Sequence, residues 1–400
     1  MREGWEVTIL GEIVEIAGGS AIPPNNEAYV GLEHFDPGER WVKRFGSTSQ
    51  VTSASTPFRP GDILFSKLRP YLNKVSMVDQ RGWCSNEALV YRAIPEKVSQ
   101  GYLFNILRSQ QAIAFATQSS AGTRMPRTSL KKMDSYPVGL PPLREQKRIV
   151  DLMDSVDAAI SAAQAEVDTA VALETRINLE VFRPLLAGAT AQVSTRTDMK
   201  LGRQKGGAAA TDVPKYATVK SGSITSTHLV NPASFDEMPI PEAWIASHGL
   251  RPGDVVLAEG GTVGESAVWP DHLVGDYGYD KHVIRIRPLE GKSTTNFIAH
   301  WCRFMKASGT FDATATGKTI SALGFGRAAK LPFPDLSVTE QEDVVRPLVA
   351  ADSAVSTSQS ALDRLRDLRS SMLSVLLSGE HEIPETYDQF LGLPERAQAG

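Results

Sequence analysis

Two long stretches of the chain repeat apolar residues at alternating steps of four and three. From Ile149 to Val181 this walk meets nine apolar residues in ten positions, and from Val344 to Leu376 it meets eight in ten. A heptad pattern sustained over this length predicts a coiled-coil helix. The residues expected along the two seams are Ile149, Met153, Val156, Ile160, Val167, Leu348, Val355, Leu362, Leu365 and Met372.

The ends of these helices carry their own signals. Pro184 should end the first helix near Arg183, and Pro347 should kink the second helix or delay its start. The Thr339 to Glu342 spacing predicts a capping box. Residues 149–181 alone would form a rod of about 50 Å. A lone rod would expose its stripe, so each rod is expected to pair with the other. The alternative is that each helix covers a separate core.

Short β-like runs rich in Gly, Pro and Thr occupy the first three quarters of each half of the chain. Each half also has one helical stretch, at 102–117 and at 296–308. The strand-like runs are WEVTILGEIVEI, DILFSKL and EALVYRAI, then DVVLAE, ESAVW and KHVIRIRP. This pattern predicts an α+β fold, with two pseudo-repeated α+β domains joined by two long antiparallel coiled-coil helices.

The two halves repeat one another. RPGDILF at 59 matches RPGDVVL at 251, and Glu145-Gln146 matches Glu340-Gln341. Three further anchors, Leu10-Gly11, Gly122 and LLAG at 185, match Leu201-Gly202, Gly317 and LLSG at 376. All five shifts lie between 191 and 195 residues, which indicates a duplicated unit. The expected division is 1–143 and 189–335 for the two domains, 144–188 and 336–380 for the long helices, and 381–400 for a tail.

Composition and charge narrow the class of protein. Two cysteines, Cys84 and Cys302, imply neither a disulfide framework nor a zinc site, and no apolar run is long enough to span a membrane. A cytoplasmic location is therefore expected. The net charge of -4 is uneven, because 144–180, 340–370 and 380–400 contribute -4, -2 and -4, so the remainder carries +6. The charge distribution therefore allows a basic face that binds phosphate groups.

Catalytic motifs match poorly. Thr316-Gly317-Lys318-Thr319 resembles the end of a phosphate-binding loop, but Asp312 stands where that loop needs glycine. Pro270-Asp271 and Glu290-Gly291-Lys292 fit a Mg²⁺ nuclease pattern, although the second segment has the composition of a loop. The histidines have no metal-binding spacing. No catalytic residue and no metal site are predicted.

The whole arrangement resembles the DNA-specificity subunit of type I restriction-modification enzymes. The most telling segments are GDILFSKLRPYLNK at 61, GLPPLREQKRIV at 139, LPFPDLSVTEQEDVV at 331 and LLSGEHEIPETYD at 376. The resemblance implies two target-recognition domains, each reading one half of a split DNA sequence, and paired helices that bind two methyltransferase subunits. Because the two domains have diverged, the target should be bipartite and asymmetric.

The partners implied by this resemblance are double-stranded DNA, methyltransferase subunits and restriction or translocase subunits. S-adenosylmethionine, ATP and Mg²⁺ would belong to those partners, and none to this chain. The alternative hypothesis is a duplicated coiled-coil adaptor whose α+β domains bind protein. The residues expected to contact DNA are Lys67, Arg69, Tyr71, Lys74, Arg124 and Arg127 in the first copy, and Lys281, Lys318, Thr319 and Arg327 in the second.

Overall fold

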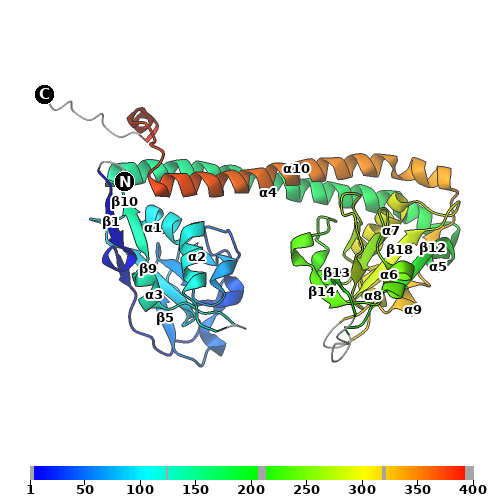
Figure 1. Ribbon diagram of the computed structural model, residues 1–400, viewed down its shortest axis with the longest axis horizontal. Coiled ribbons are helices and arrows are strands. Elements are labelled where there is room, and N and C mark those ends of the chain that lie inside the picture. The colour runs from blue at the N-terminus through cyan, green and yellow to red at the C-terminus, as the bar shows by residue number, and fades with distance from the viewer. Residues whose placement is uncertain (1–3, 123–124, 206–212, 318–320, 392–400) are drawn as a thin grey trace. The chain divides into compact units, whose positions relative to one another are not determined.

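The structure is a computed structural model that describes residues 4–122, 125–205, 213–317 and 321–391. The chain divides into two compact units (Figure 1). Unit 1 comprises residues 1–162 and 363–400, and unit 2 comprises residues 163–362. Each unit holds one sheet-containing domain, called head 1 and head 2 below, and one half of each of two long helices. These are α4 (Leu143–Ala187) and α10 (Val338–Ser378). The predicted α+β fold with two sheet-containing domains is confirmed.

Head 1 contains two four-stranded sheets and a short strand pair. One sheet has the order β2-β9-β6-β7, the other β4-β3-β8-β5, and β1 pairs with β10. The strands are β1 (Glu6–Ile9), β2 (Val14–Ile16), β3 (Ala28–Val30), β4 (Gly46–Ser47), β5 (Ser55–Phe58), β6 (Ile63–Ser66), β7 (Val75–Met77), β8 (Gly82–Ser85), β9 (Ala88–Ala93) and β10 (Pro137–Leu140). The helices are α1 (Gln100–Leu107), α2 (Gln110–Gln118) and α3 (Leu130–Asp134), with 3₁₀ turns at Leu10–Glu12, Leu32–His34, Thr48–Gln50 and Pro70–Leu72.

Head 2 repeats this plan. Its sheets have the orders β12-β18-β15-β16 and β14-β13-β17, and β11 pairs with β19. The strands are β11 (Thr190–Gln192), β12 (Thr197–Leu201), β13 (Lys215–Val219), β14 (Asp236–Pro239), β15 (Val255–Ala258), β16 (Ser266–Val268), β17 (Gly278–Tyr279), β18 (Val283–Pro288) and β19 (Pro332–Pro334). The helices are α5 (Val193–Arg196), α6 (Glu242–His248), α7 (Thr295–Ala307), α8 (Thr310–Thr314) and α9 (Phe325–Ala328), with 3₁₀ turns at Ser221–Ser223 and Pro232–Ser234.

The central strand of each head divides its side chains between two cores. On β6, Ile63 and Phe65 enter the core that includes α1 and the start of α4, whereas Leu64 enters the core between the sheets. On β15, Val255 and Leu257 face the helical core and Val256 faces the other. This alternation follows from the period of two in a strand, and it explains why both runs are apolar throughout.

A buried aspartate anchors the same turn in each head. Asp62 accepts the backbone N–H of Arg59 at 2.8 Å and both guanidinium N–H groups of Arg92 at 2.7 and 2.8 Å. In head 2, Asp254 accepts the Arg251 N–H at 2.8 Å and the Arg287 guanidinium at 2.6 and 2.8 Å. Both aspartates are 1% exposed. The repeated RPGD sequence therefore encodes a buried bidentate ion pair.

The repeated glutamine fastens each head to its long helix. Gln146 accepts the Ser99 N–H at 2.8 Å and donates to the carbonyls of Lys97 and Pro141. Its counterpart Gln341 accepts the Thr294 N–H at 3.1 Å and donates to the carbonyls of Lys292 and Leu336. Ser99 caps α1 and Thr294 caps α7, and every partner is shifted by 195 residues. Both glutamine side chains are fully buried.

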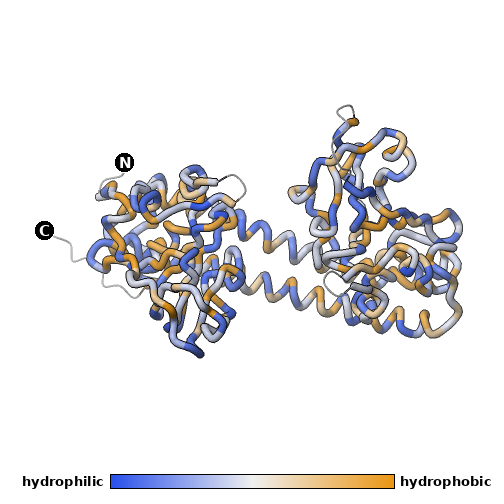
Figure 2. Tube along the Cα trace, turned by 90° about the horizontal axis from the view of Figure 1, so that it is seen from below, coloured by the Kyte–Doolittle hydropathy of each residue, from blue (hydrophilic) through white to orange (hydrophobic). Residues whose placement is uncertain are grey.

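Within each unit the halves of α4 and α10 share a core. In unit 1, Ile149 and Met153 near the start of α4 pack in one core with Leu373 and Leu376 near the end of α10. Figure 1 shows the start of α4 beside the end of α10. In unit 2, Phe182 near the end of α4 shares a core with Val345 and Leu348 near the start of α10. The two halves are therefore antiparallel inside each unit. Figure 2 shows apolar and polar residues alternating along both helices.

The predicted seam residues lie at different depths. Among them Ile149, Met153, Val167, Leu348, Val355 and Leu362 are buried, and Val156, Ile160, Leu365 and Met372 are half-buried. The Arg369 guanidinium contacts Asp157 from the opposite helix, so polar groups interrupt this seam.

Two expectations about the helix ends are wrong, and Pro347 does not delay the start of the second helix. Helix α4 continues past Pro184 to Ala187, because a proline in the last turn removes one hydrogen bond and leaves the earlier turns intact. Helix α10 begins nine residues before Pro347, which lies inside it. The capping box is formed by Ser337 and Glu340, not by Thr339 and Glu342. Here Glu340 accepts the Ser337 N–H at 2.8 Å, and Ser337 accepts the Glu340 N–H at 3.3 Å.

Two further sequence interpretations change. The helix predicted over 102–117 is two helices, because Ser109 interrupts it and caps α2 by accepting the Ala112 N–H. The match of Leu10 with Leu201 is also wrong. Leu10 follows β1 and donates to the Tyr136 carbonyl, and its counterpart is Val193, which follows β11 and donates to the Leu331 carbonyl.

The segment after α10 packs on the start of α4, within unit 1. A 3₁₀ turn at Glu385–Leu391 places Asp388 beside Arg144 and Arg148, with Nε–Oδ distances of 2.7 and 2.6 Å. The Tyr387 hydroxyl donates to Asp151 at 2.9 Å. The hydrogen bonds from Arg148 hold the pKa of Asp388 at about 2. Among the described residues, no helix combines the length and apolarity that crossing a membrane requires.

Candidate nucleic-acid interface

Two loops of head 1 lie side by side and carry most of the predicted DNA contacts. The Arg69 N–H donates to the Pro126 carbonyl at 2.8 Å, and the Thr128 N–H donates to the Lys67 carbonyl at 3.0 Å. A β-bridge joins Leu68 to Arg127. We call this feature the head 1 loop pair, residues 66–74, 121–122 and 125–128. It brings Lys67, Arg69 and Arg127 together although they are far apart in sequence.

Exposure distinguishes the candidates within the loop pair. Tyr71 is 51% exposed, so it is not a core residue, and Arg69 is also exposed, with a left-handed φ of 50°. The Arg127 side chain is 55% exposed and pairs with Glu87 at 2.9 Å. Lys74 is half-buried and donates to the Leu32 carbonyl at 2.7 Å, so its ammonium group supports the loop. Arg124 lies outside the described residues.

The equivalent loops of head 2 have a different charge. The Glu259 N–H donates to the His282 carbonyl as the Lys67 N–H donates to that of Glu87, both at 2.7 Å. A bridge joins Gly260 to Ala322, as one joins Leu68 to Arg127. Glu259, Gly261 and Ala322 therefore stand where head 1 has Lys67, Arg69 and Arg127. Arg327, an expected DNA contact of the second copy, is therefore not the equivalent of Arg127.

The guanidinium of Arg327 is occupied within its own loop. It donates to the carbonyls of Thr314, Leu323 and Ala322 and to the Thr316 hydroxyl, at 2.8 to 3.1 Å. This residue therefore holds the loop together. Lys281 is exposed at the start of β18. Lys318 and Thr319 lie outside the described residues.

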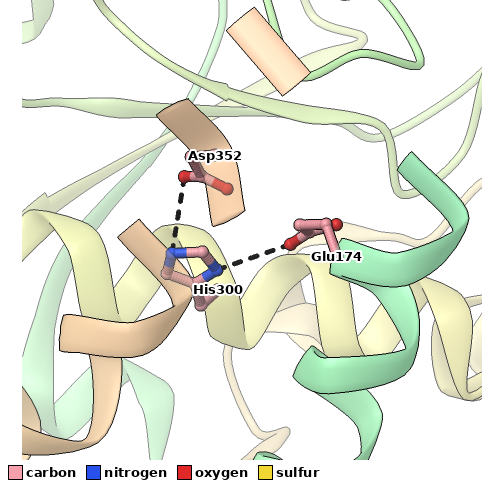
Figure 3. Close-up of side chains that lie close together, drawn as sticks. All are labelled: Glu174, His300 and Asp352. Carbon is pink, nitrogen blue, oxygen red and sulfur yellow. Dashed lines mark ion pairs between the residues drawn. The ribbon is translucent and has the colours of Figure 1, made fainter. Parts of the chain in front are cut away.

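A buried polar cluster lies beneath head 2, where α4, α7 and α10 meet (Figure 3). His300 lies between two carboxylates, with its Nδ1 3.7 Å from Glu174 and its Nε2 3.5 Å from Asp352. The Arg303 guanidinium donates to both carboxylates, at 3.2 Å to Glu174. Burial opposes the charge on Glu174, but His300 and Arg303 lower its pKa overall. We name Glu174, His300, Arg303 and Asp352 the unit 2 cluster.

The ligand atoms of Glu174, His300 and Asp352 lie within 4.8 Å of one another, as in a metal site. The same space holds Arg303, whose guanidinium already bridges the two carboxylates. A metal ion bound there would face this cation at close range. The chemistry of the group therefore fits an ion-pair junction better than a metal centre.

Unit 1 has a matching cluster at positions shifted by 195 residues. Asn105, Arg108 and Asp157 correspond to His300, Arg303 and Asp352, and Arg369 corresponds to Glu174. Arg369 donates to Asp157 at 3.1 Å and to Asn105 at 3.3 Å, and Arg108 lies 3.5 Å from Asp157. Burial, and then the charge of Arg369, lower the pKa of Arg108 to about 10. One position has thus reversed its charge between the units.

These clusters were missed by sequence reasoning, although a signal was present. Glu174 and Arg369 each stand 25 residues into the heptad walk, and each breaks its apolar stripe. A charged residue at the same seam position in both copies indicates a buried polar contact. The nuclease pattern gains no support, because Glu290 and Lys292 lie in a turn after β18, as predicted, and Lys292 contacts the Thr195 carbonyl.

Comparison with known proteins finds a similar domain in the first part of the chain. Residues 2–168 match the family model described as the type I restriction modification DNA specificity domain. The type I restriction enzyme EcoDI specificity subunit of Escherichia coli is 29% identical over 138 residues, which is 34% of this chain and 30% of that protein. The match therefore spans less than a third of that relative.

Solved structures are similar over nearly the whole chain. The HsdS subunit from Thermoanaerobacter tengcongensis is 18% identical, covering 95% of this chain and 98% of the other, with a TM-score of 0.39. The type I restriction-modification S subunit from M. genitalium is 10% identical, covering 93% and 96%, with a TM-score of 0.45. The family model covers residues 2–168, and this part of the chain is therefore similar to the type I restriction modification DNA specificity domain.

Proposed function

We propose that this chain is the DNA-recognition subunit of a type I restriction-modification complex and that it binds a bipartite, asymmetric DNA target. The match of residues 2–168 to a DNA specificity domain supports a DNA-reading role. The observation that supports a two-part target is that the two heads share a set of buried contacts, called the frame below, but differ in the charge of their equivalent surface loops. Both heads share strand order, the buried Arg and Asp pair and the glutamine junction, but their equivalent loops carry Lys67, Arg69 and Arg127 in one head and Glu259, Gly261 and Ala322 in the other.

Arginine and lysine have different roles in this proposal. Arg69 and Arg127 can each donate two hydrogen bonds to a guanine edge, whereas Lys67 would position a phosphate. Head 2 cannot make the same contacts with the equivalent loops, so it would read a different sequence. The two halves of the target would then differ.

The proposal extends to partners. The chain would be non-catalytic, cytoplasmic, and joined to two methyltransferase subunits and to restriction or translocase subunits. S-adenosylmethionine, ATP and Mg²⁺ would be bound by those subunits. The acidic exposed faces of α4 and α10 are poor surfaces for DNA and suit protein partners.

The test is selection from a random duplex library by the purified chain together with its methyltransferase partner. Enrichment of two short, different motifs with a fixed spacing between them supports the proposal. Recovery of unselected DNA, with an affinity that does not fall as salt rises, would leave the adaptor function in its place.

A further inference from the structure

Head 2 carries a group of cations at positions different from those of the head 1 loop pair. Lys205, Lys220 and Lys281 line one shallow hollow of about 170 Å³, together with His282, Asp236 and Asp280. Arg203 adjoins it, because a parallel bridge joins Arg203 to Asp280. We call Arg203, Lys205, Lys220 and Lys281 the head 2 cation patch.

The patch keeps an excess of positive charge at an accessible surface. Lys220 contacts Asp236 at 2.8 Å and Lys205 lies 3.9 Å from the same carboxylate, so two ammonium groups share one acid. The Lys205 side chain is 71% exposed and that of Lys220 is 38% exposed. Asp280 is the second acid, and its carboxylate accepts the His282 N–H at 2.9 Å. The hollow is therefore lined by three lysines and two carboxylates, and Arg203 lies next to it in the chain fold.

None of these cations has a counterpart in head 1. Val30 pairs with Cys84 as Val219 pairs with Tyr279, so Gly31 stands where head 2 has Lys220. Glu87 is equivalent to His282, which makes Asn86 equivalent to Lys281.

The same comparison places the other two positions. Ile16 pairs with Tyr91 as Met199 pairs with Ile286, and counting onward aligns Ser20 with Arg203 and Ile22 with Lys205. The Ser20 hydroxyl contacts Asn86 at 3.1 Å, which agrees with this alignment. Head 1 is thus uncharged at all four positions.

The exchange is reciprocal. Where head 1 carries Lys67, Arg69 and Arg127, head 2 has Glu259, Gly261 and Ala322. Where head 2 carries its patch, head 1 has Ser20, Ile22, Gly31 and Asn86. A fold that keeps its buried contacts while its cations change position points to a ligand that is polyanionic in both heads and is contacted from different positions in each.

Building on the proposed function, we infer that head 2 holds DNA through phosphate contacts of its cation patch and not through the loops equivalent to the head 1 loop pair. Three of the four cations are lysines, which act as point charges and position a backbone without reading bases. The patch would therefore set affinity and orientation, while sequence preference in this half would come from other side chains.

The test uses the full chain with Arg203, Lys205, Lys220 and Lys281 all changed to Gln. Binding to a labelled random-sequence duplex is measured between about 50 and 200 mM salt. Each lost phosphate contact should lower the slope of log affinity against log salt by about 0.9, so a total reduction of roughly 2 to 4 is expected. The motif selected from a random library should stay the same.

The matched control changes Arg183, Arg251, Lys292 and Lys330 to Gln, which removes the same charge from exposed positions elsewhere in unit 2. The control should keep the wild-type slope. An equal loss in the control, or an unchanged slope in the patch variant, overturns the inference. Lys281→Gln alone provides a variant that breaks no ion pair among the described residues and should lower the slope by about 0.9.

The wild-type chain separates this inference from the proposed function. Salt-dependent DNA binding by the wild type, with an unaffected patch variant, removes the patch and keeps the DNA-recognition role. No salt-dependent binding by the wild type removes both.

Discussion

Head 1 and head 2 share the same buried contacts but carry different charges on their surfaces. The frame is the part that stays: the Asp62 and Asp254 ion pairs, the Gln146 and Gln341 junctions, and the matching sheet orders. The surface cations and one buried charge are the parts that change. Duplicated domains keep the contacts that hold a head on its helix and vary the groups that meet a ligand, because only the former are needed for folding.

The buried clusters add a second lesson. In unit 1, Asn105 accepts a hydrogen bond from Arg369, whereas in unit 2 His300 faces the carboxylate of Glu174. The residue on the head has changed together with the charge on the helix. A charge reversal in a buried site is tolerated when its neighbour changes from an acceptor to a group that can donate.

The largest expected effect comes from removing the shared ion pair. Asp62→Ala and Asp254→Ala should each destabilise the edited head by about 3 kcal/mol, because each leaves a largely buried arginine without its carboxylate. Hydrogen exchange of β6 and β15 measures each head separately. Equal losses support one frame, and a loss in only one head would break the comparison.

The cluster exchange should have a comparable effect and should be reversible. Arg369→Glu places two carboxylates beside Arg108 and is expected to cost about 3 kcal/mol in unit 1. Adding Asn105→His rebuilds the unit 2 composition and should recover part of that loss.

The reciprocal pair is Glu174→Arg with and without His300→Asn, read by exchange of α7 amides. Rescue in both directions is expected. Double variants no more stable than the single variants would show that the head residue and the helix charge are independent.

A smaller effect is expected at the junctions. Gln146→Leu and Gln341→Leu each leave a helix-cap N–H and two carbonyls without a partner, which should cost about 2 kcal/mol. The expected readout is faster exchange at the first turns of α1 and α7. Lys147→Gln is a neighbouring control at an exposed position that leaves the Gln146 contacts intact and should change little.

The smallest effect concerns a contact present in only one unit. Asp388 packs on Arg144 and Arg148, whose counterparts Thr339 and Asp343 carry no positive charge. Since its folded pKa of about 2 lies below the unfolded value of about 3.9, the contact stabilises fully above the higher value and is lost as pH falls through about 2.

The Arg148 Nε–H signal in an NMR titration should therefore stay constant from neutral pH to about pH 4 and move only below it. In Asp388→Asn the signal should begin at a different position and show no such step. A step near neutral pH in the wild type would contradict this assignment.

Periodicity was sufficient to predict both long helices and the strands β1, β2, β6, β9, β15, β16 and β18, because an apolar stripe or a buried strand leaves a pattern in the sequence, but it missed the other, mostly shorter strands. Lys67 and Arg127 lie close together because a β-bridge joins Leu68 to Arg127, and no local sequence pattern encodes that bridge. Arg327 was predicted to contact DNA because the sequence alone cannot distinguish an arginine whose guanidinium holds its own loop together from one that faces solvent. The sequence showed that the Glu-Gln pair is repeated, but not why. The structure explains it, because Gln146 and Gln341 accept the N–H groups of Ser99 and Thr294, which lie far away in the sequence.

Selection of DNA from a random library tests the central claim most directly, when the wild-type chain is compared with Arg69→Ala/Arg127→Ala and with the head 2 patch variant. The account predicts a split motif for the wild type and relaxation of one half only in the Arg69 and Arg127 variant. It predicts an unchanged motif with weaker, less salt-dependent binding in the patch variant. A single undivided motif, or loss of both halves from the head 1 substitutions alone, would contradict the account.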